Sequence, residues 1–371
     1  MNDPVALTKK LLAYKTVNPP GNEDASIRFL GELLQENGYA VDYPSFAPGR
    51  TSLIARSDGK GEPLILSGHI DTVPLGNTDW TKDPFAGPAE GDKLFGRGVS
   101  DMKSGVAAIT AAALKAGQDK ILKKALWVVI TASEETACTG AEFLVKKGHL
   151  KGKAGAILVA EPTGNYPCLG HKGATWVEAG TSGKTAHASM PEEGDNAIYK
   201  AAAAITRLKD FTFKVQPHPL LGEPKFTVGT MGGGLNINSV PDQARFTIDI
   251  RTIPELTTDK VLDSLQQVLG DEVSLKLLIN APAIASEADD PFVQAVFGIM
   301  EPVLGTRPEP RSVPYFTDGS VFKDGLGSPP IIILGPGEAD QAHKTDEFCY
   351  ISKIKQAAEA YLQIIKKWCR G

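Results

Sequence analysis

The stretch LILSGHIDTVP, residues 64–74, begins as a buried strand and ends with polar chemistry. Its first three residues are apolar, which is typical of a strand covered on both faces. His69 and Asp71 then follow where the strand runs out, just before Pro74. A solvated turn and a functional site both explain a histidine and a carboxylate at a strand end, so the neighbouring segments have to decide between them.

Strand-like and helix-like patterns alternate from Val5 to about Pro162. Continuous apolar strands alternating with helices favour an α/β fold, in which a mostly parallel sheet is covered by helices on both faces. The pattern resumes at Pro291 with a helix, a strand and a final helix. Strands are expected at 64–68, 125–132, 154–161 and 329–335, and helices at about 25–38, 105–116, 140–148 and 351–368.

Between residues 174 and 285 the sequence pattern differs from the alternation of strands and helices on either side. ARFTIDIRTIP, residues 244–254, alternates strictly between apolar and polar side chains, which indicates a half-exposed antiparallel strand. Helical patterns at about 195–208 and 257–269 lie among further strand-like runs. We therefore expect an inserted α+β domain over 174–285, within a discontinuous α/β domain made of 1–173 and 286–371.

Composition excludes several classes of protein. The 371 residues are 42% hydrophobic and 22% charged with a net charge of −5, so neither a nucleic-acid partner nor a membrane partner is expected. The four cysteines are scattered without C-x-x-C spacing, which is typical of free thiols in a reducing compartment. No segment resembles a secretory signal or a membrane span. A cytoplasmic location is the expectation.

Residues able to bind metal follow each apolar strand of the α/β pattern. Because the carboxyl ends of parallel strands meet at one edge of a sheet, residues far apart in sequence are expected to converge there. One more carboxylate directly precedes the helix expected at 105–116. The set consists of His69 and Asp71, Glu134 and Glu135, Glu161, His343, and Asp101 within GRGVSDMKSG.

Histidines and carboxylates without thiolates favour catalytic zinc, cobalt or manganese over a closed structural zinc site. One aspartate bridging two metals would leave a histidine and a carboxylate for each. Two such metals, roughly 3.5–4 Å apart, hold a shared water and lower its pKa towards about 7. Asp71 would then accept the ring N–H of His69 and fix the tautomer that binds metal.

Five motifs in this order resemble those of the co-catalytic dizinc amidohydrolases and metallopeptidases. That family includes acetylornithine deacetylase, succinyl-diaminopimelate desuccinylase, aminoacylase and glutamate carboxypeptidase. The resemblance covers essentially the whole chain, and it extends into the insert through GKTAHASMPEEGDNAI (183–198) and NSVPDQARFTIDIR (238–251). The five motifs are SGHIDTVP, GRGVSDMKSG, TASEET, AEPT and AHKTDE.

The resemblance implies a role for each candidate residue. Two divalent ions, zinc or alternatively cobalt or manganese, would share Asp101 as a bridging ligand. His69 and Glu161 would complete one metal site, and Glu135 and His343 the other. Glu134 would act as general base and then as general acid. This division agrees with the residue pattern, since two adjacent carboxylates at a strand end rarely aim at the same metal.

The resemblance also implies that the insert is a lid and dimerisation domain. Arg251 would bind the substrate carboxylate with Asn238 assisting, although the alternation of its strand also permits a solvated arginine. His187 would reach the active site of the other subunit of a homodimer and stabilise the oxyanion there. Without the resemblance, His187 reads as a polar loop residue.

The expected reaction is hydrolysis of the amide bond of an N-acyl amino acid by a metal-bridged water. Acetylornithine deacetylase-like and succinyl-diaminopimelate desuccinylase-like activities both fit. The ending Asp346-Glu347 of the last motif resembles that of deacetylases and aminoacylases, which argues against a desuccinylase. A dipeptidase or carboxypeptidase with the same two metals is the alternative enzyme. A metal-binding or regulatory homologue without catalysis is the alternative of another class, and a non-ligating Glu134 argues against it.

Overall fold

The computed structural model describes residues 3–369, which divide into two compact units. Unit 1 contains the chain up to Gly170, the segment Ser286–Val313 and the chain from Thr317 onward. Unit 2 contains His171–Ala285 and Pro314–Phe316. The segment Pro314–Phe316 therefore belongs to unit 2, whereas the sequence pattern predicted it to be part of the α/β domain.

The predicted fold class is confirmed by the central sheet of unit 1, whose strands are mostly parallel. Four neighbours in the sheet, β8, β5, β9 and β17, run parallel; at one edge β4 pairs antiparallel with β8, and β1 pairs antiparallel with β4. In order across the sheet, the strands are β1 (Ala40–Asp42), β4 (Leu53–Arg56), β8 (Lys124–Thr131), β5 (Lys60–His69), β9 (Ala156–Val159) and β17 (Ile331–Ile333).

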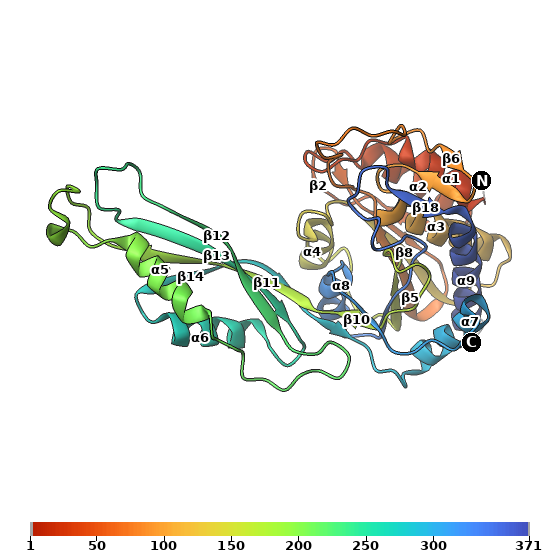
Figure 1. Ribbon diagram of the computed structural model, residues 1–371. Helices are drawn as coiled ribbons and strands as arrows, with labels where there is room; N and C mark the ends of the chain where they lie inside the picture. Colours follow the sequence, from red (N-terminus) through yellow and green to blue (C-terminus); the bar gives the residue numbers. More distant parts are fainter. Residues whose placement is uncertain (1–2, 370–371) are drawn as a thin grey trace. The chain divides into compact units, whose positions relative to one another are not determined.

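Helices cover both faces of this sheet, as expected for buried parallel strands (Figure 1). One layer contains α3 (Ser104–Gln118) and α9 (Ile351–Cys369), which pack on each other, with α1 (Pro4–Leu12), α2 (Asp24–Glu36) and α7 (Pro291–Leu304) around them. The other contains α4 (Thr139–Lys146) and α8 (Gly319–Gly325). Nearly every residue of α3 is buried, which its run of small side chains permits.

A small antiparallel sheet joins two distant parts of unit 1. It contains β6 (Ala89–Glu90), β7 (Lys93–Phe95) and β18 (Phe348–Tyr350), and Phe348 pairs with Phe95. Two segments that matter for the site adjoin these strands: the turn after β7, which leads into the irregular helical segment η1 (Val99–Lys103), and the loop before β18. Strands β2 (Ser45–Ala47) and β3 (Arg50–Thr51) pair separately.

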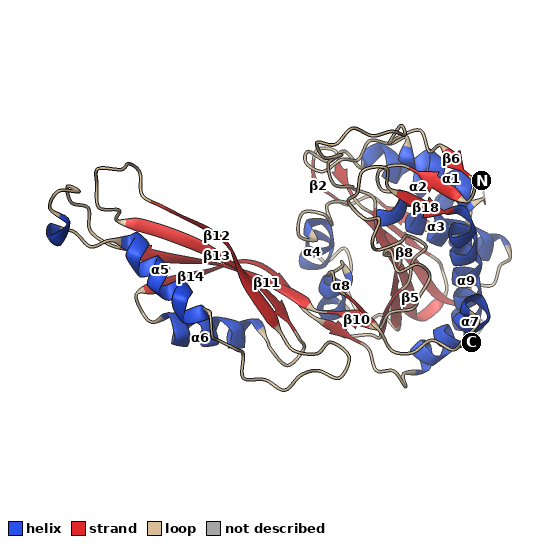
Figure 2. Ribbon diagram, viewed as in Figure 1, coloured by secondary structure: helices blue, strands red, loops and turns tan. Residues whose placement is uncertain are grey.

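Unit 2 is an antiparallel sheet with two helices on one face (Figure 2). The sheet order is β12 (Lys225–Gly233), β13 (Gln243–Thr252), β11 (Gly173–Ser182) and β14 (Val273–Ala281). Helices α5 (Ala197–Leu208) and α6 (Thr258–Leu269) pack on the apolar side of β13, whose alternation explains why one face is buried. The remaining short elements are η2 (Pro191–Glu193), β10 (Gly170–His171), β15 (Ile284–Ala285) and β16 (Ser312–Val313).

None of the helices found between residues 3 and 369 combines the length and the apolar character that crossing a membrane requires.

Candidate metal centre

The ends of the parallel strands bring the candidate ligands together at one edge of the sheet. His69 is the last residue of β5, Glu134 and Glu135 follow β8, and Glu161 follows β9. Register explains the convergence, since His69 lies opposite Thr131 of β8, and Ser67 opposite Val159 of β9. His343 comes from the loop between β17 and β18, and Asp101 lies in η1.

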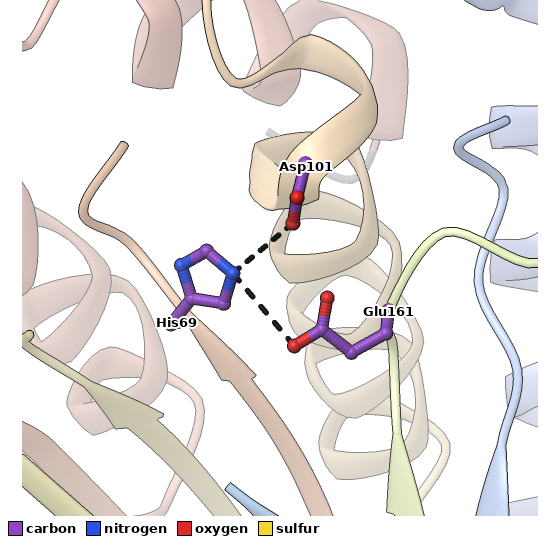
Figure 3. Close-up of side chains that lie close together, drawn as sticks. All are labelled: His69, Asp101 and Glu161. Atoms are coloured by element: carbon purple, nitrogen blue, oxygen red, sulfur yellow. Dashed lines mark hydrogen bonds and ion pairs between the residues drawn. The ribbon is translucent and has the colours of Figure 1, made fainter. Parts of the chain in front are cut away.

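One group of possible metal ligands consists of His69, Asp101 and Glu161, with ligand atoms within 4.8 Å of one another. The Nε2 atom of His69 lies 3.2 Å from Oδ1 of Asp101 and 3.7 Å from Oε1 of Glu161. Figure 3 shows all three side chains pointing toward one small volume. His69 and Glu161 are buried, so a cation bound there would be largely shielded from solvent.

A second group consists of Asp101, Glu135 and His343. Nε2 of His343 lies 3.4 Å from Oδ2 of Asp101 and 3.2 Å from Oε2 of Glu135. Asp101 therefore presents one carboxylate oxygen to each group. A single carboxylate between two sets of ligands is the arrangement that a pair of metal ions requires.

The electrostatics of the site favour bound cations. Burial raises the pKa of Glu161 well above its usual value, and the carboxylates Asp101, Glu134 and Glu135 raise it further. Hydrogen bonds to Asp101 and Glu135 raise the pKa of His343 to about 10. One oxygen of Glu135, Oε1, is buried without a hydrogen-bond partner. Carboxylates that outnumber the two imidazoles, together with one orphaned oxygen, fit a pair of divalent ions.

Asp71 is fully buried and serves more partners than the sequence suggests. The ring nitrogen Nδ1 of His69 lies 3.0 Å from the main-chain oxygen of Asp71 and 3.5 Å from its Oδ1, so the main chain is the nearer acceptor. The carboxylate accepts the main-chain N–H of Glu134 (3.0 Å) and of Glu135 (3.2 Å). It also accepts the amide N–H of Asn18 at 2.8 Å. Asp71 thus holds the loop that carries both glutamates.

Glu134 lies outside both ligand groups. It forms a third cluster with Cys138 and Asp318, in which Sγ of Cys138 is 3.8 Å from Oε1 of Glu134. Asp318 accepts a hydrogen bond of 2.5 Å from the hydroxyl of Thr131. Burial raises the pKa of Glu134 well above its usual value. Cys138 follows the double glutamate closely in the sequence and carries no motif of its own, and in the structure its thiol contacts this carboxylate.

The three candidate residues of the insert occupy two places in unit 2. His187 and Asn238 are neighbours, because the N–H of Ala188 donates to the main-chain oxygen of Asn238 at 3.1 Å. Arg251 stands near the other end of β13, where it pairs with Asp249 at 3.0 Å. From the first residue of β13 to Arg251 the strand extends by about 25 Å, at roughly 3.3 Å per residue. Arg251 and Asn238 of one chain are therefore too far apart to contact the same carboxylate.

Several residues support the site although the sequence does not reveal this role. Asn18 carries no motif and contacts Asp71 from a distant loop. Arg97 and Glu347 lie inside two of the quoted motifs, GRGVSDMKSG and AHKTDE, but nothing in their spacing shows that they pair. Contacts to main-chain N–H groups leave no pattern in a sequence. The only sequence signal for Arg97 and Glu347 is that both lie inside a quoted motif.

Comparison with known proteins decides the family. The profile of peptidase family M20/M25/M40 matches residues 65–367. The chain belongs to this family. Like its M20 relatives, this M20 chain is a metal-dependent hydrolase.

Curated relatives of this M20 chain carry two kinds of name. It is 30% identical to an acetylornithine deacetylase of Vibrio atlanticus, over 94% of this chain and 92% of the relative. It is 28% identical to a "probable succinyl-diaminopimelate desuccinylase" of Staphylococcus epidermidis, over 97% of this chain and 98% of the relative. An M20 metallo-carboxypeptidase from Sulfolobus solfataricus shares the fold, with a TM-score of 0.80, 19% identity and 99% of each chain covered.

Proposed function

We propose that this M20 hydrolase cleaves the amide bond of N-acyl amino acids, as an acetylornithine deacetylase-like enzyme. The observation that carries the proposal is the position of Asp101 between two ligand groups, with Glu134 beside both and part of neither. His69, Asp101 and Glu161 would hold one divalent ion, and Asp101, Glu135 and His343 the other. Zinc suits this donor set, and cobalt and manganese are the alternatives.

Bound metal ions would lower the pKa of a water molecule and polarise the amide carbonyl. The chain's own contribution to the chemistry is proton transfer at Glu134. Its carboxylate takes a proton from the attacking water and delivers it to the leaving nitrogen. Asp71 keeps Glu134 and Glu135 in their separate orientations by binding both main-chain N–H groups.

His187 has the hydrogen bonding that an oxyanion donor needs. Its Nδ1 accepts the main-chain N–H of Ser189 at 3.1 Å, so the proton of the neutral ring resides on Nε2. Nε2 is then available as a donor on an exposed side chain. We assign this donor to the carbonyl oxygen of a substrate bound by the partner subunit of a homodimer.

Two features of unit 2 support that homodimer. The loop that carries Asn238 also exposes Leu235 and Ile237 almost completely, at 99% and 100%, and such apolar side chains favour an interface. Arg251 and Asn238 of one chain cannot reach the same substrate carboxylate, because Asn238 precedes the first residue of β13 whereas Arg251 lies near its last residue. If both residues bind substrate, then one of them comes from each subunit.

The activity is tested by removing the metals by dialysis, restoring zinc, cobalt or manganese, and measuring amine release. The substrates are acetylornithine, succinyl-diaminopimelate, other N-acyl amino acids and dipeptides. We expect the highest kcat/KM for N-acetyl amino acids and no turnover without metal. Cleavage of dipeptides alone would replace the proposal with a dipeptidase, and inactivity on every substrate would refute it.

A further inference from the structure

Glu347 is fully buried and lies next to the metal centre without facing it. Its carboxylate accepts main-chain N–H groups of three residues in the turn before α3. Oε1 receives the N–H of Ser100 at 2.7 Å and of Asp101 at 3.1 Å, and Oε2 receives that of Gly98 at 3.0 Å. One side chain thus satisfies three donors of a single loop.

Other hydrogen bonds also hold this loop, among them those from the N–H of Lys103 to the main-chain oxygen of Gly98 (2.7 Å) and from the hydroxyl of Ser100 to the main-chain oxygen of Glu338 (3.0 Å). Asp101 and Met102 adopt backbone angles that are not helical, so the segment lacks the repeating hydrogen bonds of a helix at the residue that matters most. Buried main-chain donors need acceptors, because a buried N–H group without a partner destabilises the fold. The carboxylate of Glu347 supplies the acceptors at Gly98, Ser100 and Asp101, and it therefore contributes directly to the position of the main chain of Asp101.

Arg97 connects the same carboxylate to the second ligand loop. Its Nη1 donates to Oε2 of Glu347 at 2.7 Å, and its Nη2 donates to the main-chain oxygen of His343 at 3.4 Å. Asp101 and His343 are ligands in one group, although they lie far apart in the sequence. Arg97 and Glu347 contact the main chain of both.

We infer that Glu347 and Arg97 are positioning residues that set the separation of Asp101 and His343 for metal binding. The inference rests on the proposed metal centre and adds two residues that touch neither metal nor substrate. Partners outside the ligand set typically change metal affinity by about 10- to 100-fold when they are replaced. Ligand spacing would therefore depend on an ion pair that the metal never contacts.

The test compares Glu347→Gln with wild type by titrating zinc against a chelator of known affinity. Glutamine keeps the volume of the side chain but replaces one acceptor oxygen with an NH2 group, so either Arg97 and Gly98 or Ser100 and Asp101 lose their acceptor. We expect zinc affinity to fall by about 10- to 100-fold, with two ions still bound at saturation. Urea unfolding of the metal-free protein is measured in parallel to record any loss of stability.

A matched control is Glu23→Gln. Glu23 is equally buried, and its carboxylate accepts two hydrogen bonds from Arg50, at 2.9 and 3.0 Å. This variant should destabilise the metal-free protein and leave zinc affinity unchanged. Equal zinc affinity in Glu347→Gln and wild type, or an equal drop in both variants, would overturn the inference.

Arg97→Lys keeps the test decisive if Glu347→Gln does not fold. Lysine retains the charge but loses the forked geometry that reaches both Glu347 and His343. It should weaken zinc binding by about 10-fold or more, and unaltered affinity would contradict the inference. Failure of the proposed function gives a different result, because the wild-type protein would then bind no pair of zinc ions or release no amine.

Discussion

Glu134 and Glu135 are adjacent carboxylates with separate environments. Both main-chain N–H groups are fixed by Asp71, while the side chains diverge. Glu135 reaches His343, whereas Glu134 lies beside Cys138 and outside both ligand groups. The two residues are chemically identical, so their different environments account for the different roles proposed for them, Glu135 as a metal ligand and Glu134 as the general base.

Glu134→Gln is expected to keep both metals and to lose most of its turnover. Glutamine has the same shape but cannot accept a proton, and general bases contribute about 100- to 10,000-fold to rates. Glu135→Ala and His343→Ala should instead bind fewer than two ions, because each removes a ligand. Metal analysis and kcat of the three purified variants check this, and loss of a metal from Glu134→Gln would contradict the assigned roles.

Metal binding should release a proton from His343. Hydrogen bonds to Asp101 and Glu135 raise its pKa to about 10 in the metal-free protein, so the ring is protonated near neutral pH. A metal binds only the neutral ring, and binding must therefore displace this proton. Metal affinity should therefore rise as the pH increases toward about 10.

The release can be measured with an indicator dye in weakly buffered solution while zinc is added near neutral pH. His343→Ala serves as the control, since it lacks the titrating ring. A wild-type signal no larger than that of the variant would show that His343 is not a ligand in solution.

The sequence pattern predicted the site residues that stand at strand ends. His69, Glu135 and Glu161 follow apolar strands, and the sheet register then brings them to one edge. Asn18 and Glu347 could not be found in this way, because they act through hydrogen bonds from loops whose approach depends on the whole fold.

The loop between β8 and α4 has an unusual backbone for its composition. Ser133, Ala137 and Cys138 all have positive φ angles, at 67°, 67° and 54°, and none of them is glycine. Side chains with a Cβ atom are strained in this region. This loop orients Glu134 and Glu135, so the strain lies beside the proposed reaction centre.

Ala137→Gly is therefore expected to raise the free energy of unfolding. Relief of left-handed strain is worth about 1–2 kcal/mol, and the extra flexibility of unfolded glycine offsets about 0.5–1 kcal/mol of it. The net gain should be about 0.5–1 kcal/mol by urea unfolding. Ala358→Gly, in the regular helix α9, is the control and should lose stability instead. Equal losses in both variants would show that Ala137 is not strained.

Element prediction succeeded where periodic patterns are long and failed where they are short. The mostly parallel sheet follows from the apolar runs of β5, β8 and β9, and the insert strand β13 follows from its alternation. Strands β1 and β4 have three and four residues, too few to establish a period. The antiparallel edge of the sheet therefore had no signal in the sequence.

If Arg251 and Asn238 both bind substrate, their separation along unit 2 requires a site built by two subunits. Arg251→Lys should raise KM by about 10-fold or more for N-acyl amino acids, because lysine loses the two-pronged contact to a carboxylate. Metal content should not change. Arg245→Lys is the matched control, since Arg245 lies on the same face of β13 and pairs weakly with Glu178 at 3.9 Å.

The discriminating measurement for Arg251 uses one substrate in two forms. The N-acyl amino acid is compared with the same compound bearing a carboxamide in place of its carboxylate. Arg251→Lys should affect the first and spare the second. Equal losses on both forms would mean that Arg251 stabilises the fold and does not bind the carboxylate.

The proposed homodimer is tested by complementation between two variants that are expected to be inactive. If His187 acts in the partner's site, then mixing His187→Ala with Glu134→Ala gives mixed dimers in which one site has both substitutions and the other has neither. Random reassociation should restore up to about one quarter of the wild-type rate, because half of the dimers are mixed and each has one intact site. Subunit exchange is verified by mass-tagging one variant. Exchange without recovered activity, or full activity of His187→Ala alone, would place the oxyanion donor elsewhere.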